Sequence, residues 1–305
     1  MIIVVAPGQG SQTPGFLAPW LELPGALDLL GSLSEAAGVD LAAHGTVSDA
    51  DTIRDTAIAQ PLIVAAGILT LDALAETDHL AKTAGIAGHS VGEFTAAAGA
   101  GVLDATDAVR LVGIRGRAMA EAAALEATGM SAVIGGDEAD VLAALETNGL
   151  FPANYNGGGQ LVVAGPISGL AALAENAPAG SRVIPLQVAG AFHTSYMGSA
   201  VEKLRAAAAD VNTNAPTKKL WTNRDGSIVT DGPAFRDLLV GQVSSPVRWD
   251  KCMQGFEAAG VTGIIELAPA GALVGLAKRA LKGVPTVAVK TPDDLAAARE
   301  LIDSL

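Results

Sequence analysis

The feature that most limits the possible folds is a change in the order of predicted strands and helices along the chain. Short apolar segments such as IIVVA (residues 2–6) and KTAGIAG (82–88) alternate with helical patterns such as residues 59–76, which favours a parallel sheet covered by helices. From about Met130 the order becomes strand, helix, strand, strand, helix, strand, the order of a ferredoxin-like unit. We therefore predict an α/β core over residues 1–125 and 190–305, with an inserted ferredoxin-like (βαββαβ) subdomain over residues 126–189.

Composition and charge exclude several classes of protein. The 305 residues, 50% of them apolar, suffice for a large core, and a net charge of −13 argues against binding of nucleic acid, whose phosphates need Lys and Arg. The N-terminal apolar run is too short for a signal peptide or a membrane span. A single cysteine, Cys252, excludes an intrachain disulfide and a thiolate metal cluster. We expect a cytoplasmic protein with no metal site, nucleic-acid partner or membrane contact.

One serine stands where an α/β protein can expose a nucleophile. Ser90 lies between Gly88 and Gly92, after a short apolar strand and before a helix rich in small residues. This is the sharp strand-to-helix turn of a nucleophile elbow, where N–H groups at the start of the helix favour negative charge. The alternative is a serine that only caps the helix.

A serine nucleophile needs a base, and the chain has four histidines. His89 is adjacent to Ser90 and, at the end of an extended strand, should point to the opposite face. His44 and His79 lie in segments typical of the surface. His193 remains, in GAFHTSYM, where the chain re-enters the core. It is our candidate base, and a purely structural histidine is the alternative.

The loop after the first strand contains Gly8-x-Gly10 but has Thr13 in place of the third glycine of a dinucleotide-binding loop. We therefore reject a nucleotide site. Such a turn can instead direct the backbone N–H of Gln9, together with that of Val91, at a developing oxyanion. A plain tight turn is the alternative.

Helical geometry singles out one of the three arginines in DAVRLVGIRGRAMAEA. At ~100° per residue, Arg110 and Arg117 share one face, whereas Arg115 lies between Leu111 and Met119 on another. A buried guanidinium is costly unless it is paired. Arg115 should therefore have an anionic partner, either an internal carboxylate or a carboxylate of the substrate.

Six segments occur together and in order: PGQGSQ, QPLIVAAG, GHSVGE, VRLVGIRGRAM, GAFHTSYM and SPVRW. With them, essentially the whole chain resembles the malonyl-CoA:acyl carrier protein transacylases of fatty-acid synthesis. The resemblance implies a hydrolase-like core, no cofactor, and a ping-pong transfer in which Ser90 attacks the thioester of malonyl-CoA and His193 carries the proton. The malonyl-serine ester then reacts with the phosphopantetheine thiol of the carrier protein.

The resemblance also implies roles for further residues. Gln9 and Val91 correspond to the oxyanion-hole donors, and Arg115 to the arginine that forms a two-pronged salt bridge with the malonyl carboxylate. A backbone carbonyl in the segment SSPVRW orients the imidazole, and we place this carbonyl near Arg248. In this segment Ser245 stands where an asparagine is expected.

Pocket residues follow from the same resemblance. Gln60, His89 and Asn156 are similar to polar pocket residues of the family, although capping or turn formation explains Gln60 and Asn156 nearly as well. Phe192 and Met119 would occupy the space that a C2 methyl branch needs, and related acyltransferases for methylmalonyl units typically have serine at the Phe192 position. Malonyl is the expected acyl group, although one methyl group is worth only ~1 to 3 kcal/mol.

The carrier proteins of this family are acidic, as is this chain. Docking then needs a local basic rim around the groove, for which the candidates are Lys218, Lys219, Lys251, Lys278, Arg279 and Lys282. The carrier protein of fatty-acid synthesis and that of polyketide synthesis are equally compatible with the sequence.

Two alternatives stay open: a serine hydrolase or thioesterase on the same elbow, and a non-enzymatic acyl-binding module. Arg115 separates a transferase from a hydrolase, which needs no cation beside its serine.

Overall fold

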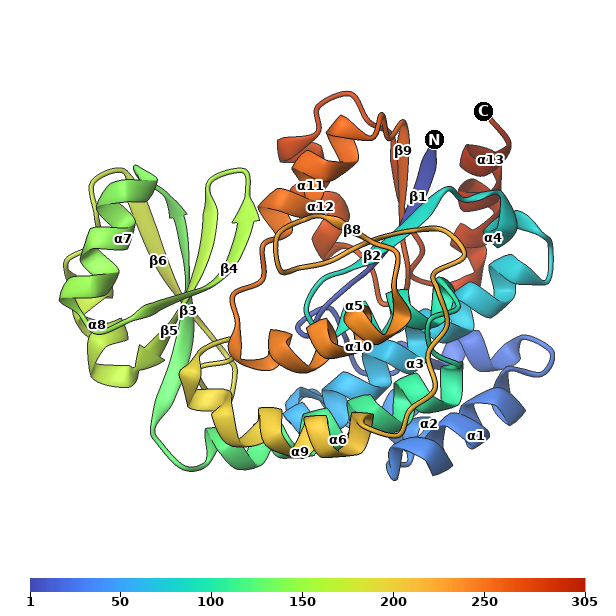
Figure 1. Cartoon of the computed structure of the whole chain (residues 1–305), viewed down its shortest axis with the longest axis horizontal. Helices are drawn as coiled ribbons and strands as arrows, with labels where there is room; N and C mark the ends of the chain where they lie inside the picture. Colours follow the sequence, from blue (N-terminus) through green and yellow to red (C-terminus); the bar gives the residue numbers. More distant parts are fainter. Residues whose placement is uncertain (305) are drawn as a thin grey trace.

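The computed structural model describes residues 1–304 and has two lobes (Figure 1). The larger lobe contains a six-stranded sheet in the order β10-β9-β1-β2-β7-β8, in which only β8 is antiparallel to its neighbour. Its strands are β1 (Ile2–Ala6), β2 (Gly85–Gly88), β7 (Lys219–Trp221), β8 (Ile228–Val229), β9 (Gly263–Glu266) and β10 (Thr286–Ala288). The predicted α/β core with a parallel sheet is confirmed, with one antiparallel strand added at an edge.

Both faces of this sheet are buried. In β1, Ile2, Val4 and Ala6 belong to one hydrophobic cluster, and Ile3 and Val5 belong to another. A parallel sheet with helices on both sides requires such a continuous apolar strand, which explains why IIVVA has no polar position.

Helices cover the sheet on its two faces. The face of Ile3 and Val5 is covered by α11 (Trp249–Ala258) and α12 (Ala272–Ala280). The other helices of this lobe pack mainly on the opposite side: α1 (Ala26–Ala37), α2 (Leu41–Thr46), α3 (Thr56–Ala75), α4 (His79–Lys82), α5 (Gly92–Gly99), α6 (Ala105–Ala123), α9 (Gly198–Ala208), α10 (Gly232–Gly241) and α13 (Leu295–Asp303).

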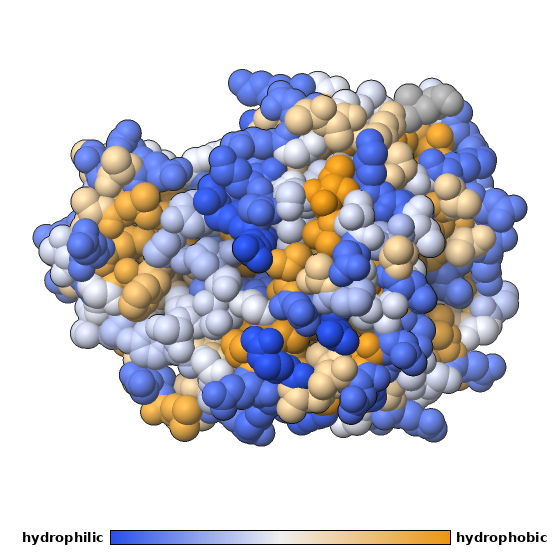
Figure 2. Space-filling model, viewed as in Figure 1, coloured by the Kyte–Doolittle hydropathy of each residue, from blue (hydrophilic) through white to orange (hydrophobic). Residues whose placement is uncertain are grey.

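The helix α3 is apolar around its whole circumference because it lies inside the larger lobe. Within residues 1–304 it is the one helix long and apolar enough to span a membrane, yet 83% of its most apolar window is buried in the protein. It packs on α5 and α6. Figure 2 shows mostly hydrophilic residues on the face of the molecule that it displays. The composition of α3 is therefore explained by burial within the fold.

The smaller lobe has the predicted βαββαβ order. Its elements are β3 (Thr128–Gly135), α7 (Glu138–Thr147), β4 (Phe151–Gly157), β5 (Gln160–Pro166), α8 (Ile167–Glu175) and β6 (Ser181–Leu186). The sheet is antiparallel, in the order β4-β5-β3-β6. Both helices pack on one face, where Val141 of α7 and Leu173 of α8 meet Val133 and Val163 of the sheet. The other face is turned to the larger lobe, and its Met130, Val162 and Ala164 belong to the hydrophobic cluster of that lobe. The predicted limits of the subdomain, residues 126 and 189, stay a prediction.

Backbone hydrogen bonds join the two lobes. The Tyr155 N–H in β4 donates to the carbonyl of Val247 (2.9 Å), and the Val247 N–H donates to the carbonyl of Ala153 (2.8 Å). Val247 belongs to the segment SSPVRW that leads into α11. The strand β4 is therefore held in register against the larger lobe at the edge of the groove.

Candidate active site

Ser90 lies at the turn between β2 and α5 and has a positive φ of 52°. The two flanking glycines allow this turn because side chains there would collide with the backbone. A Cβ on Gly88 would lie 2.0 Å from the carbonyl carbon of Gly92, and a Cβ on Gly92 would lie 2.2 Å from the carbonyl oxygen of Ala6. The turn thus has the geometry of a nucleophile elbow, and Ser90 lines a cavity between the lobes.

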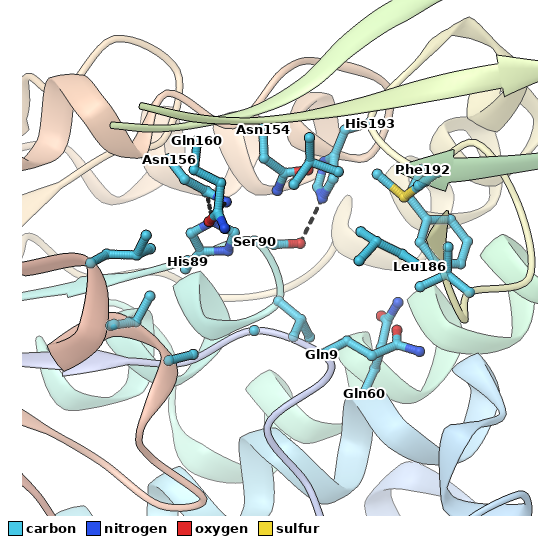
Figure 3. A pocket seen from close by; sticks show the side chains of 18 of the residues that line it. Gln9, Gln60, His89, Ser90, Asn154, Asn156, Gln160, Leu186, Phe192 and His193 are labelled. Carbon is cyan, nitrogen blue, oxygen red and sulfur yellow. Dashed lines mark hydrogen bonds between the residues drawn. The ribbon is translucent and has the colours of Figure 1, made fainter. Parts of the chain in front are cut away.

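His193 lies next to Ser90, on the segment that returns from the smaller lobe (Figure 3). Ser90 Oγ is 2.7 Å from His193 Nε2, and His193 Nδ1 is 2.9 Å from the backbone oxygen of Gln242. Because a carbonyl only accepts, Nδ1 carries the proton, and Nε2 accepts the hydrogen bond that the Ser90 hydroxyl donates. Burial, followed by the charge of Arg115, lowers the pKa of His193 to about 3, so its imidazole is neutral near pH 7.

The prediction that the carbonyl of Arg248 orients this imidazole is wrong. Arg248 precedes α11, and its carbonyl accepts from two N–H groups in the first turn of that helix. The carbonyl that faces the imidazole is that of Gln242, in the short 3₁₀ helix Gln242–Ser244. The carbonyl of Arg248 is directed into α11, where these two N–H groups hold it, so it does not face the imidazole.

Two backbone N–H groups lie beside the serine without an acceptor. Among residues 1–304, neither the N–H of Gln9 nor that of Val91 makes a hydrogen bond, and both residues line the cavity. Val91 follows Ser90 directly and precedes α5, so its N–H belongs to the open amino end of that helix. The Gln9 side chain turns away from its own backbone N–H and donates to the carbonyl of Arg54 (3.2 Å). The two groups can donate to an oxyanion that forms when Ser90 attacks a carbonyl carbon.

The inward orientation predicted for Arg115 is confirmed, since this residue of α6 is 1% exposed. Its Nη1 donates to Gln60 Oε1 (2.6 Å) and its Nη2 to Gln242 Oε1 (2.7 Å), while Nε has no partner among residues 1–304. No carboxylate of the described chain lies at ion-pair distance from it. Burial lowers the pKa of Arg115 to about 9, against an opposing effect of Glu93. The guanidinium stays charged at neutral pH and can bind an anionic group in the cavity that it lines.

The cavity in front of Ser90 has a volume of about 360 Å³ and is lined by both lobes. The larger lobe contributes the candidate reacting groups and the two charged residues, Arg115 and Arg279. The smaller lobe and the segment that follows it contribute uncharged side chains, from Met130, Asn154, Asn156, Gln160, Val162, Leu186 and Val188.

The three polar residues predicted for the pocket, Gln60, His89 and Asn156, all line this cavity. His89 Nε2 is 2.9 Å from Asn156 Oδ1, and Asn156 Nδ2 donates to Gln160 Oε1 (3.0 Å; Figure 3). The ring of His89 therefore turns to the smaller lobe, and it lines the same cavity as Ser90 instead of the opposite face expected from its place at the strand end. These hydrogen bonds link the elbow to the face of the small sheet that is turned to the larger lobe.

Phe192 and Met119, which are predicted to limit the acyl group, line the same cavity and are 6% and 1% exposed. Gln60 Nε2 donates to the sulfur of Met119 (3.4 Å) while its oxygen accepts from Arg115. One buried amide therefore holds Met119 close to the guanidinium.

Three buried polar residues of the site were not found by sequence reasoning: Glu93, Asn223 and Gln242. Asn223 Oδ1 accepts from the Ser90 N–H (2.7 Å), and Asn223 Nδ2 donates to the carbonyl of Gly88 (2.7 Å), so this side chain fixes both sides of the elbow. Glu93 is 1% exposed, and burial raises its pKa to about 7. A carboxylate in a helix of small and apolar residues was a signal for Glu93. Asn223 and Gln242 lie in segments without such a signal.

Two of the six basic residues predicted for the groove rim lie elsewhere. Lys219 pairs with Gly85 at the amino end of β2, and the Lys218 ammonium donates to the carbonyl of Leu80 (2.7 Å). Ser90 follows the carboxyl end of β2, so the sheet separates these lysines from the cavity. The prediction is wrong for both, because local charge does not reveal at which end of a strand a residue lies. Arg279 of α12 does line the cavity.

Comparison with known proteins places this geometry in a family. A family model described as an acyl transferase domain matches residues 3–294. A relative from Mycobacterium tuberculosis, named malonyl CoA-acyl carrier protein transacylase, is 54% identical over 296 residues, which cover 97% of this chain and 98% of the relative. The relative of the same name from Escherichia coli K12 is 36% identical over 304 residues, with coverage of 97% and 98%.

Solved structures agree with the sequence matches. The crystal structure of MCAT from Mycobacterium tuberculosis has a TM-score of 0.96 at 53% identity and covers 98% of this chain and 99% of its own. A malonyl-transacylase in complex with a type II PKS acyl-carrier protein has a TM-score of 0.93 at 30% identity, with coverage of 98% and 99%. The resemblance and the fold class drawn from the sequence are confirmed. This chain belongs to the acyl transferase family that includes the malonyl CoA-acyl carrier protein transacylases.

Proposed function

We propose that this protein transfers a malonyl group from malonyl-CoA to the phosphopantetheine thiol of an acyl carrier protein, through a malonyl ester of Ser90. One observation carries the proposal: Ser90 Oγ lies 2.7 Å from His193 Nε2 in the same cavity that the buried, charged Arg115 lines. The first pair can form an acyl ester, and the guanidinium can select an acyl group that ends in a carboxylate.

In the first half-reaction, Ser90 Oγ attacks the thioester carbonyl carbon while His193 Nε2 takes the hydroxyl proton. Negative charge on the former carbonyl oxygen is stabilised by the N–H groups of Gln9 and Val91. The carbon–sulfur bond then breaks, and the imidazolium returns its proton to the sulfur of coenzyme A. The carbonyl of Gln242 supports this cycle because it holds Nδ1–H and keeps Nε2 directed at the serine.

The malonyl carboxylate would pair with Arg115 through the guanidinium edge that is not already bound to Gln60 and Gln242. Arg115 lowers the pKa of His193, after burial, so neutralising its charge would make the imidazole a stronger base. Substrate binding and base strength would then be linked. Phe192 and Met119 bound the same cavity, which supports malonyl over an acyl group with an added methyl branch.

In the second half-reaction, the carrier thiol gives its proton to His193 and its sulfur attacks the ester carbon. The bond from this carbon to Ser90 Oγ then breaks, and the imidazolium returns the proton to Oγ. No step needs a metal or another cofactor. For carrier docking we retain Lys251, Lys278, Arg279 and Lys282, of which Arg279 has direct access to the cavity. An acidic carrier would meet these residues at the mouth of the groove.

Intact-protein mass spectrometry after incubation with malonyl-CoA tests the proposal. We expect one added malonyl mass on the wild-type protein, located in the peptide that contains Ser90, and no addition to Ser90→Ala. An unmodified wild-type protein would instead favour an acyl-binding module.

The same adduct separates a transferase from a hydrolase. Addition of a carrier protein with its phosphopantetheine arm should remove the malonyl group from Ser90 and place it on the carrier. Release of free malonate at the same rate with and without the carrier would indicate a hydrolase. The buried Arg115 supports the first outcome, because a hydrolase needs no cation beside the serine.

A further inference from the structure

Glu93 is a buried carboxylate that the proposed reaction does not use. It lies in the first turn of α5, just after the nucleophile, and is 1% exposed. Its Oε1 accepts from the Asn223 N–H (2.7 Å), and its Oε2 accepts from Gln242 Nε2. Both oxygens therefore face donors, and the carboxylate is an acceptor in both directions.

Gln242 connects this carboxylate to the rest of the site. Its Nε2 donates to Glu93 and to the Ser90 carbonyl (2.8 Å), which uses both amide hydrogens. Its Oε1 accepts from Arg115 Nη2 (2.7 Å), and its backbone carbonyl faces His193 Nδ1 (2.9 Å). One glutamine thus touches the elbow, the base and the cation.

The orientation of the Gln242 amide depends on Glu93 together with the Ser90 carbonyl, since both accept from its NH₂ group. A glutamine can present either its oxygen or its NH₂ group in a given direction. Because Glu93 accepts, the NH₂ group must face it, and the oxygen is left to face Arg115. The reversed amide would direct NH₂ hydrogens at the guanidinium, which also only donates.

In its ionised form, Glu93 also places negative charge near Arg115 without blocking it. Among residues 1–304 no carboxylate pairs directly with the guanidinium, and Glu93 acts on it through the bridging amide. A direct ion pair would occupy the edge of Arg115 that an acyl carboxylate needs. The bridge keeps this edge free while it fixes the position of the guanidinium.

We propose that Glu93 is a positioning residue that sets the selectivity of the site for acyl groups ending in a carboxylate, by orienting Gln242 and, through it, Arg115. This inference rests on the proposed function and deepens it. Glu93 touches no reacting atom, so its removal should affect the acyl groups that use Arg115 and spare those that do not.

The test compares acylation of Ser90 by malonyl-CoA and by acetyl-CoA in Glu93→Gln. The new amide would present its NH₂ group to Gln242 and reverse the Gln242 amide. We expect kcat/KM for malonyl-CoA to fall roughly 10- to 100-fold, the worth of one hydrogen bond to a charged group, and that for acetyl-CoA to change less than about threefold. Glu257→Gln, at an exposed position of α11, is the matched control and should change neither value.

A double-mutant cycle shows whether Glu93 acts through Arg115. Arg115→Ala should lose malonyl transfer far more than acetyl transfer, and Glu93→Gln should have no further effect on the malonyl-to-acetyl ratio in that background. The proposal would be overturned if Glu93→Gln lowered kcat/KM equally for malonyl-CoA and acetyl-CoA. It would also be overturned if the effects of the two substitutions on the malonyl-to-acetyl ratio multiplied in the double variant.

Folding is followed by thermal unfolding of each variant. If Glu93→Gln does not fold, Glu93→Asp takes its place, because its shorter carboxylate does not reach both the Asn223 N–H and the Gln242 amide and should lower the malonyl-to-acetyl ratio of kcat/KM in the same direction. A wild-type protein that forms no malonyl ester would overturn both this inference and the proposed function. Wild-type malonylation with an unchanged acyl ratio in the variants would overturn the role of Glu93 alone.

Discussion

The two lobes build one cavity by different means. The larger lobe places Ser90, His193 and Arg115 through close backbone contacts and buried polar side chains from distant parts of the chain. The smaller lobe offers alternate residues of a regular antiparallel sheet, such as Met130 and Val162, none of them charged. The comparison indicates that the larger lobe supplies the candidate reacting groups and the charged part of the cavity wall, whereas the smaller lobe supplies an uncharged part of that wall.

Among the tests of this division between the lobes, we expect the largest effect on the rate at the candidate base, His193. His193→Ala should slow malonylation of Ser90 by roughly 10²- to 10⁴-fold, because it removes positioned proton transfer while the cavity wall stays intact. Rapid-quench kinetics with mass detection measures the acylation rate. A rate within threefold of the wild type would assign the base to another group.

The second prediction concerns the tight packing of the larger lobe. Gly92→Ala should lower the free energy of unfolding by about 1–3 kcal/mol or prevent folding, because its Cβ would lie 2.2 Å from the carbonyl oxygen of Ala6. Gly275→Ala in α12 is the control, since no atom lies within 4 Å of its added Cβ and helical alanine is favoured by roughly 0.5–1 kcal/mol. Chemical denaturation of both variants measures the difference. Similar stabilities would show that the elbow tolerates a side chain.

The pH dependence of stability should also come from the larger lobe. The pKa of His193 falls from 6.5 to about 3 on folding, so the unfolded chain binds more protons between these values. Stability from this residue is therefore lost as pH falls through this window, by at most roughly 1.4 kcal/mol per pH unit. Glu93 acts in the opposite direction. Its pKa rises from 4.5 to about 7 on folding, so its contribution to the stability of the protein is lost as pH rises through this window.

Substitution isolates the contribution of the histidine. The free energy of unfolding of His193→Gln, measured from pH 4 to 7, should decrease less on acidification than that of the wild type, since both proteins share Glu93. Equal slopes for the two proteins would mean that another group, such as His89, whose pKa burial also lowers, causes the acid sensitivity.

The smallest effect is expected in the smaller lobe. Asn156→Ala removes one hydrogen bond to His89 and one to Gln160, neither of which touches the reacting atoms. Since neither bond contacts the reacting atoms, we expect no more than the worth of one bond, about 0.5–1.5 kcal/mol, to affect the rate, so malonyl transfer should fall less than about tenfold. Steady-state kinetics measures it. A loss as large as that of His193→Ala would contradict the division between the lobes.

Local patterns were sufficient for much of this site. Apolar periodicity predicted both sheets, the glycines around Ser90 predicted the elbow, and helical geometry predicted that Arg115 points inward. These features depend on residues within one or two turns of each other, and backbone sterics constrain them strongly. The roles of Ser90, His193 and Arg115 in the reaction stay predictions that the experiments above test.

Long-range contacts decided the rest. The carbonyl that holds His193 belongs to Gln242 and not to Arg248, Asn223 fastens the elbow from another strand end, and Lys218 lies at the far end of the sheet. Each of these contacts depends on the packing of segments far apart in the chain. The sequence of one short segment does not indicate which distant carbonyl or amide will contact it. The sequence by itself therefore determined the elements and the identity of the candidate reacting groups, whereas only the tertiary structure decided which buried polar partners hold them in place.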